Sequence, residues 1–238
     1  MAFNFKITTT KQAAQHQGIK VCVYGGAGAG KTRLCATCTP EDHSKTLIIS
    51  AESGLLSLRG VEIPVVQVSK FAELEEVYQF LKAGEHRFEW VCLDSISEIA
   101  EQCLKHYKEL HGDGANGWAI YGSLFSEMDS ILKRFRDLPM NVYMSAKMER
   151  DKSDDGTLLY LPMMPGNKLT AQLPFLFDEM FCLHSFSETT DDGVVIHRRF
   201  QTFRDLKYEC KDRSGALDPW EDASLSHIAN KINSHLEG

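Results

Sequence analysis

The sequence predicts an α/β fold in which helices flank a mainly parallel sheet, with antiparallel hairpins added in the C-terminal third. From residue 19 onward, short apolar runs alternate with amphipathic segments, the pattern of strands and crossover helices in a parallel sheet. Beyond Met144, apolar runs are separated by Asp-Gly turn sequences, which are typical of hairpins. We expect one domain over residues 19–238, preceded by an arm formed by residues 1–18.

Short runs of apolar residues predict the strands of the parallel sheet. Runs that are apolar throughout are typical of strands buried on both faces, where each side chain packs against a helix layer. The expected strands are 21–24 (VCVY), 47–50 (LIIS), 90–93 (WVCL) and 142–144 (VYM).

Apolar residues recur at helical spacing between these runs. Leu74, Val77, Tyr78 and Leu81 predict one amphipathic helix, and Gly84 follows at the position where a left-handed residue often ends a helix. A glycine-rich break separates the second and third helices, and a last helix closes the chain. The expected helices are 71–82, 96–107, 124–135 and 223–236, with the break at 111–117.

Two turn sequences predict the hairpins. The first, KSDDGT at 152–157, precedes the apolar run LLYL. The second, DDG at 191–193, lies between MFCL and VVI. Asp-Gly pairs adopt the positive φ angles that tight hairpins require, so we expect antiparallel strands on both sides of each turn.

The composition is that of a globular protein. The chain has 238 residues, 43% hydrophobic and 25% charged, and its net charge of −7 argues against a surface that is basic throughout. Seven cysteines, mostly within apolar runs, indicate buried free thiols in a reducing compartment. The first twenty residues lack the apolar core of a signal peptide, and no run reaches the ~18 residues of a membrane span. We therefore expect a cytoplasmic protein that does not bind membranes.

Residues 25–32, GGAGAGKT, match the P-loop pattern G-x-x-x-x-G-K-[ST] between an expected strand and an expected helix. The loop backbone would wrap a polyphosphate, Lys31 would reach the β and γ oxygens, and Thr32 would ligate Mg²⁺. ATP and Mg²⁺ are the expected cofactors. The predicted nucleotide contacts are Gly25, Gly26, Ala27, Gly28, Ala29, Gly30, Lys31, Thr32, Arg33 and Ser145.

An acidic residue, Asp94, ends the apolar strand at 90–93, as in a Walker B segment that holds magnesium. An Asp at this place could instead cap the helix that follows. The neighbouring residue is Ser95, so a water-activating glutamate must come from elsewhere. Glu52 follows the strand at 47–50 on the sheet edge where such sites form, although a solvated glutamate is the alternative. Ser145, with Lys147 just beyond it, could sense the γ-phosphate, or the two residues could simply end the strand.

These residues resemble the RecA-type branch of P-loop ATPases, and most closely the small phage-encoded RecA-like single-strand-annealing recombinases. The resemblance implies an ATPase that binds single-stranded DNA and promotes annealing in recombination, in a bacterial host cytoplasm. The matching segments are GGAGAGKT (25–32), SAESG (50–54), VCLDSIS (91–97), VYMSAK (142–147), MMPGNK (163–168), FLFDEM (175–180) and KDR (211–213).

The resemblance also implies a homo-oligomeric ring or filament with nucleotide sites between subunits. In that branch a basic pair reaches the neighbour's nucleotide, and Lys211 and Arg213 match it. A single-strand-binding protein is a further expected partner. Segments 109–118 and 147–168 correspond to the DNA-contacting loops, although the second carries as many acids as bases. The expected DNA contacts are Lys108, Trp118, Lys147, Arg150, Lys152 and Lys168.

Two other function classes remain open. A nucleotide-switched interaction or helicase-loading factor would bind ATP and hydrolyse it slowly. A small-molecule kinase would need an arginine-rich lid, and segment 147–168 has one arginine. Cys35 and Cys38 with His43 resemble half a zinc site, but core packing is the expected role of these cysteines.

Overall fold

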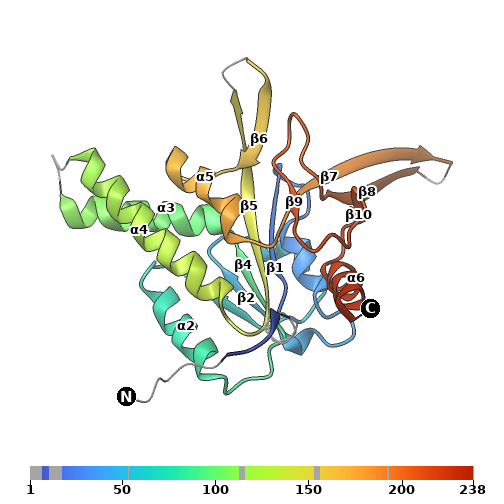
Figure 1. Ribbon diagram of the computed structural model, residues 1–238, viewed down its shortest axis with the longest axis horizontal. Helices are drawn as coiled ribbons and strands as arrows, with labels where there is room; N and C mark the ends of the chain where they lie inside the picture. Colours follow the sequence, from blue (N-terminus) through green and yellow to red (C-terminus); the bar gives the residue numbers. More distant parts are fainter. Residues whose placement is uncertain are drawn as a thin grey trace.

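A ten-stranded sheet forms the centre of the part of the chain that the structure describes (Figure 1). This computed structural model describes residues 7–10, 18–52, 54–112, 116–152, 156–191 and 193–237. The strand order is β10-β8-β7-β1-β5-β4-β2-β3, with β6 paired to β5 and β9 paired to β7. Most of the expected N-terminal arm lies outside the described residues.

The central strands run parallel, as expected. β1 pairs with both β5 and β7, β4 lies between β5 and β2, and β3 forms the edge. The strands of this part are β1 (Lys20–Gly25), β2 (Thr46–Ser50), β3 (Val65–Gln67), β4 (Trp90–Asp94), β5 (Asn141–Lys152) and β7 (Glu179–Thr190). Their register places Gly25 beside Lys147 and Ser50 beside Asp94, so the carboxyl ends of four strands meet at one edge.

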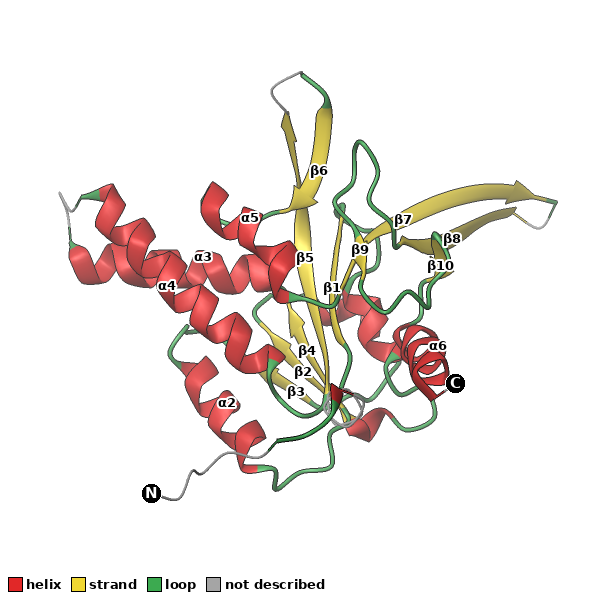
Figure 2. Cartoon of the chain, in the orientation of Figure 1, coloured by secondary structure: helices red, strands yellow, loops and turns green. Residues whose placement is uncertain are grey.

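Helices cover both faces of this sheet. α2 (Glu73–Ala83), α3 (Ile96–His111), α4 (Gly117–Arg136) and α5 (Asn167–Leu176) lie on one side, and α6 (Leu225–Glu237) lies on the other (Figure 2). Side chains alternate along a strand, so Cys22 and Tyr24 pack into the first layer while Val21 and Val23 pack into the second. None of the described helices is both long enough and apolar enough to cross a membrane.

Both expected hairpins are present and project from the body (Figure 2). β5 pairs antiparallel with β6 (Leu158–Pro162), and the turn residues 153–155 lie outside the described residues. β7 pairs with β8 (Gly193–Gln201) as far as Thr190 and Gly193. The short strands β9 (Lys211–Asp212) and β10 (Trp220–Asp222) complete the sheet.

The segment after the P-loop differs from expectation. It forms a 3₁₀ helix, η1 (Thr32–Thr37), rather than a longer α-helix. Pro40 and the β-branched residues Thr37 and Thr39 disfavour a helix that continues through this segment. Two further 3₁₀ turns, η2 (His43–Lys45) and η3 (Leu55–Leu58), flank β2.

Candidate nucleotide site

A cavity of about 610 Å³ opens at the carboxyl edge of the parallel sheet. Its walls come from the P-loop, from Glu52 after β2, from Asp94 at the end of β4 and Ser95 after it, and from Lys147 on β5. In open parallel sheets this edge is where ligands bind. The fold therefore brings together the P-loop and the two acids that the sequence singled out.

The P-loop backbone adopts conformations that favour glycine. Gly28 and Gly30 have φ angles of 73° and 106°.

Lys31 Nζ folds back over the loop and donates hydrogen bonds to Gly25 O (2.8 Å) and Gly26 O (3.0 Å). Burial lowers the pKa of Lys31, although nearby Asp94 and Glu52 oppose this. A polyphosphate within the loop would offer this ammonium stronger acceptors than the two carbonyls.

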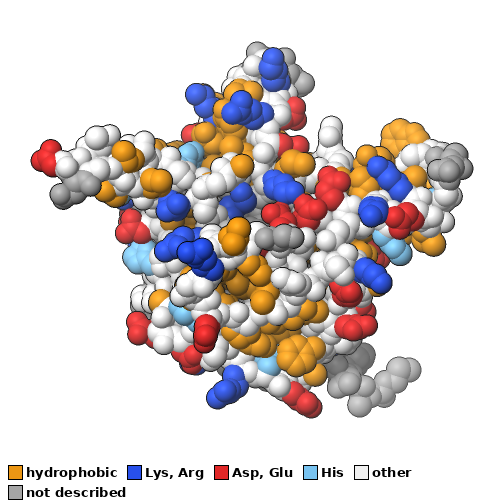
Figure 3. Space-filling view, turned by 180° about the vertical axis from the view of Figure 1, so that it is seen from behind, with side chains coloured by type: hydrophobic (Ala, Val, Ile, Leu, Met, Phe, Trp, Pro, Cys, Tyr) orange, Lys and Arg blue, Asp and Glu red, His pale blue; other side chains and the backbone are white. Residues whose placement is uncertain are grey.

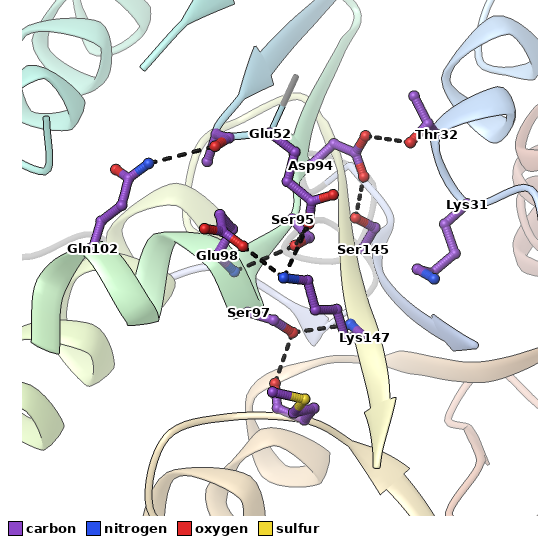
Figure 4. A network of polar contacts seen from close by, with 12 residues as sticks. Lys31, Thr32, Glu52, Asp94, Ser95, Ser97, Glu98, Gln102, Ser145 and Lys147 are labelled. Carbon is purple, nitrogen blue, oxygen red and sulfur yellow. Dashed lines mark hydrogen bonds and ion pairs between the residues drawn. The ribbon is translucent and has the colours of Figure 1, made fainter. Parts of the chain in front are cut away.

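Thr32 and Asp94, the two residues expected to hold magnesium, are in direct contact beside the P-loop. Thr32 Oγ1 donates a 2.7 Å hydrogen bond to Asp94 Oδ2, and Ser145 Oγ donates to the other oxygen, Oδ1 (Figure 4). Asp94 is 5% exposed, and within the described residues the hydrogen bonds to its carboxylate come from the hydroxyls of Thr32 and Ser145. A hydroxyl beside a carboxylate, next to a glycine loop, fits Mg²⁺ bound with a nucleotide.

The helix cap at this position is Ser95, not Asp94. Ser95 Oγ accepts the backbone N–H of Glu98 at 3.3 Å, which caps α3. The side chain of Asp94 is therefore directed at Thr32 and Ser145. Ser145 is fully buried behind Asp94, and its direct contact with a nucleotide stays a prediction.

Glu52 is held in the cavity by a network of polar contacts (Figure 4). Its Oε1 accepts a 2.6 Å hydrogen bond from Ser95 Oγ and lies 3.7 Å from Lys147 Nζ. Lys147 Nζ also contacts Glu98 Oε2 at 2.6 Å, and this hydrogen bond raises the pKa of Lys147. The carboxylate is thus oriented by a hydroxyl and a cation, and it is 36% exposed and open to water.

Two arginines line the same cavity. Arg33, expected from the sequence, donates from Nη1 to Ser57 O at 3.4 Å. Arg198 on β8 was not identified from the sequence; its Nε donates to Ala29 O at 2.9 Å. No local pattern marks Arg198, because its position depends on how a distant hairpin pairs with β7.

The expected basic pair lies at the opposite edge of the sheet. Val21 at the start of β1 pairs with Glu179, which in turn pairs with Asp212, between Lys211 and Arg213. Lys211 Nζ donates to Pro174 O (2.9 Å) and Phe177 O (2.7 Å). Arg213 Nη1 contacts Asp178 Oδ1 at 2.6 Å. Neither side chain reaches the P-loop of its own chain, so their role in a neighbour's site stays a prediction.

The residues expected to contact DNA occupy different places. Lys147 lies in the nucleotide cavity rather than in a surface loop, because β5 continues straight past the P-loop. Segment 147–168 forms the β5–β6 hairpin and the start of α5, where Lys168 Nζ lies 4.0 Å from the ring centroid of Phe125.

The other expected DNA contacts are at the surface. Lys and Arg side chains gather on the projection at the top of Figure 3, which is the β5–β6 hairpin; Arg150 and Lys152 are exposed there. Lys108 is exposed near the end of α3, and Trp118 at the start of α4 is 88% exposed. These side chains are accessible to a macromolecular partner.

The cysteines have the expected structural role. All seven are free and buried. Cys38 Sγ, at the end of η1, lies 3.6 Å from Cys92 Sγ on β4. Within the described residues no group of three or more His, Cys, Asp or Glu could hold a metal ion. Cys182 is buried, and the neighbouring His184 is hydrogen-bonded to Gln201.

Comparisons with known proteins match most of the chain to one family. A family model described as "AAA domain" matches residues 17–214. No curated protein matches the chain. Among solved structures, an ATPase from the type III secretion system of pathogenic bacteria is similar, with 14% sequence identity and a TM-score of 0.49. That similarity covers 71% of this chain and 51% of the other, so the chain spans about half the length of that structure.

Proposed function

The chain belongs to the AAA domain family of P-loop ATPases, and on that premise we propose that it hydrolyses ATP to ADP and phosphate with Mg²⁺. The observation that carries this proposal is the convergence of Lys31, Thr32, Asp94 and Glu52 on one cavity. The P-loop supplies phosphate contacts. The hydroxyl oxygen of Thr32 and the carboxylate of Asp94 supply a site for the metal.

Each residue has a distinct task in this reaction. The P-loop amides and Lys31 hold the β- and γ-phosphates, with Lys31 leaving Gly25 O and Gly26 O to do so. Thr32 and Asp94 would hold Mg²⁺, which when bound would offset the negative charge of the phosphates. Glu52 accepts a proton from a water molecule as that water attacks the γ-phosphorus and the bond to the ADP oxygen breaks.

The experiment that tests this role compares Glu52→Gln with Glu76→Gln. Glu76 is exposed on α2 and is not among the residues that line the cavity. Glu52→Gln should abolish phosphate release while Mg-ATP still binds, because the amide cannot accept the proton. Glu76→Gln should match the wild type. Full hydrolysis by Glu52→Gln would exclude Glu52 as the base.

We propose in addition that single-stranded DNA is the partner and that the biological role is annealing in phage recombination. The exposed Arg150 and Lys152 on the β5–β6 hairpin and the exposed Trp118 support this, since cations with an aromatic side chain suit phosphate contact and base stacking. The sequence resemblance to RecA-like annealing proteins supports it as well. The proposed assembly is a homo-oligomer in which Arg213 reaches the neighbour's site.

The test is ATP hydrolysis across a protein titration, with and without single-stranded DNA. Arg213→Ala is compared with Arg204→Ala, since both arginines are exposed and each pairs with one acid. DNA and rising protein concentration should both increase the specific activity, and only Arg213→Ala should remove that increase. A hydrolysis rate that does not change with DNA or with protein concentration would favour a slow nucleotide switch. Phosphate transfer to a small-molecule acceptor would favour a kinase.

A further inference from the structure

An arginine from the second hairpin lies against the P-loop of its own chain. Arg198 is on β8, opposite Ser185 on β7, and both side chains point to the P-loop. Arg198 Nε donates a 2.9 Å hydrogen bond to Ala29 O, and Ser185 Oγ donates to the same oxygen at 3.3 Å. The hairpin therefore holds one carbonyl of the loop from two sides.

The guanidinium occupies space that only a glycine leaves free. A Cβ placed on Gly30 would lie 2.6 Å from Arg198 Nε and 3.0 Å from its Cδ. Gly30 directly precedes Lys31, and Arg198 lines the same cavity as Lys31 and Thr32. The arginine thus approaches the P-loop at the residue next to the phosphate-binding lysine.

Arg198 is also available for an anion. No carboxylate in the described residues forms an ion pair with it, whereas its neighbour Arg199 lies 3.9 Å from Asp222 Oδ1. The bond to Ala29 O uses Nε alone, which leaves the two terminal nitrogens for other acceptors. Guanidinium groups bind phosphate oxygens through two parallel hydrogen bonds, and an anchored one loses little entropy in doing so.

We propose that Arg198 is a catalytic arginine that binds the polyphosphate of ATP within its own chain and stabilises the charge of the transferred phosphoryl group. This inference rests on the ATPase function proposed above. It gives each nucleotide site a cation from its own chain, in addition to the pair Lys211 and Arg213 at the other edge of the sheet, which is proposed to reach a neighbour's site.

The test compares Arg198→Ala, Arg198→Lys and Arg199→Ala in the full chain. Arg199 is the matched control, because it is the next residue on β8, faces the other side of the hairpin and carries the same charge. Arg198→Ala should lower kcat for ATP by ~100-fold or more, the range seen when one preorganised charge donor or arginine finger is removed. Arg198→Lys should be intermediate, and Arg199→Ala should match the wild type.

A second readout separates charge stabilisation from simple support of the P-loop. Added guanidinium, well below denaturing concentrations, should raise kcat of Arg198→Ala and leave Arg199→Ala unchanged, because the free cation replaces the missing group. Thermal unfolding without nucleotide should be similar in Arg198→Ala and Arg199→Ala. Ser185→Ala, which removes the other bond to Ala29 O, should lower kcat far less than Arg198→Ala.

Three results would overturn the inference. If the wild type hydrolyses ATP and Arg198→Ala does so at the rate of Arg199→Ala, the arginine has no part in the reaction while the ATPase function stands. If Ser185→Ala lowers kcat as much as Arg198→Ala and guanidinium restores neither, Arg198 only supports the loop. A wild-type chain that neither binds nor hydrolyses ATP would overturn the proposed function and this inference together.

Discussion

Lys147 Nζ lies 3.7 Å from Glu52 Oε1, so a cation on β5 faces the carboxylate proposed as the base. The same ammonium contacts Glu98 Oε2 at 2.6 Å, and that hydrogen bond raises its pKa. Lys147 therefore stays charged at neutral pH. One cation balances two carboxylates beside the place where a γ-phosphate would lie.

Lys147→Met should lower kcat of ATP hydrolysis at least ~10-fold, because preorganised charges near the transferred group are worth this much or more. Without the cation, Glu52 and Glu98 would repel the phosphate and Glu52 would lose one of its two restraints. Lys152→Met is the control, since Lys152 is exposed further along β5, and its rate without DNA should equal that of the wild type. Equal steady-state rates in both variants would contradict this role of Lys147.

A buried tyrosine holds the start of the 3₁₀ helix that follows the P-loop. Tyr143 is fully buried on β5, and its hydroxyl donates to Lys31 O at 2.9 Å. Tyr143→Phe should destabilise the fold by ~1–2 kcal/mol, because Lys31 O loses a buried partner, and should raise KM for ATP. Tyr24→Phe is the matched control. Tyr24 is equally buried, but its hydroxyl donates to Tyr160 O at 3.1 Å rather than to a P-loop residue. Chemical denaturation and steady-state kinetics of both variants measure the two effects; an unchanged KM in Tyr143→Phe would show that the bond serves stability alone.

The two positive-φ glycines of the P-loop should respond differently to alanine. Both positions would strain a side chain, by ~1–3 kcal/mol. At Gly28 a Cβ meets nothing within 4 Å, whereas at Gly30 it would lie 2.6 Å from Arg198 Nε. Gly30→Ala should therefore weaken Mg-ATP binding more than Gly28→Ala, and titration with a fluorescent ATP analogue measures the difference. If Gly30→Ala weakens binding less in the Arg198→Ala background than in the wild type, the clash with this arginine is the cause; if the order of the two glycine variants is reversed, the prediction is wrong.

Local signals in the sequence were sufficient to predict the strands of the parallel sheet, the P-loop and the position of Asp94. The runs that form β1, β2 and β4 are apolar throughout, and the P-loop directly follows β1. Asp94 could be placed near Thr32 because Asp94 ends one strand of the parallel sheet and the P-loop follows the end of another. Such features depend on neighbours in the chain, so a sequence pattern reveals them.

The features that sequence reasoning missed depend on distant pairing. Lys147 was expected just beyond Ser145, but its contacts with Glu52 and Glu98 depend on the pairing of β5 with β1, which sets Lys147 beside Gly25. Arg198 reaches Ala29 through the pairing of β8 with β7, and a one-residue shift would turn it to the other face. α5 was not predicted because Pro174 lies within it, and its helical face is set by packing against α4.

A buried carboxyl beside the basic pair makes stability depend on pH. Glu179 on β7 is 2% exposed, and one of its oxygens accepts the backbone N–H of Ser214 at 3.2 Å. The other oxygen, Oε2, has no hydrogen-bond partner among the described residues. Burial, and to a smaller extent the charge of Asp212, raises the pKa of Glu179 from 4.5 to about 8.

This raised pKa predicts that Glu179 favours the folded state at low pH and that its contribution is lost as pH rises toward 8. Between the two pKa values the folded chain keeps a proton that the unfolded chain has released, so the free energy of unfolding falls by at most ~1.4 kcal/mol per pH unit. Glu179→Gln should remove this decrease, because the amide stays neutral and still accepts from Ser214, whereas Glu76→Gln on the surface should keep it. Urea denaturation from pH 5 to pH 9 measures the slopes. The same slope in Glu179→Gln and the wild type would mean that Glu179 is ionised in the folded protein, which its burial opposes.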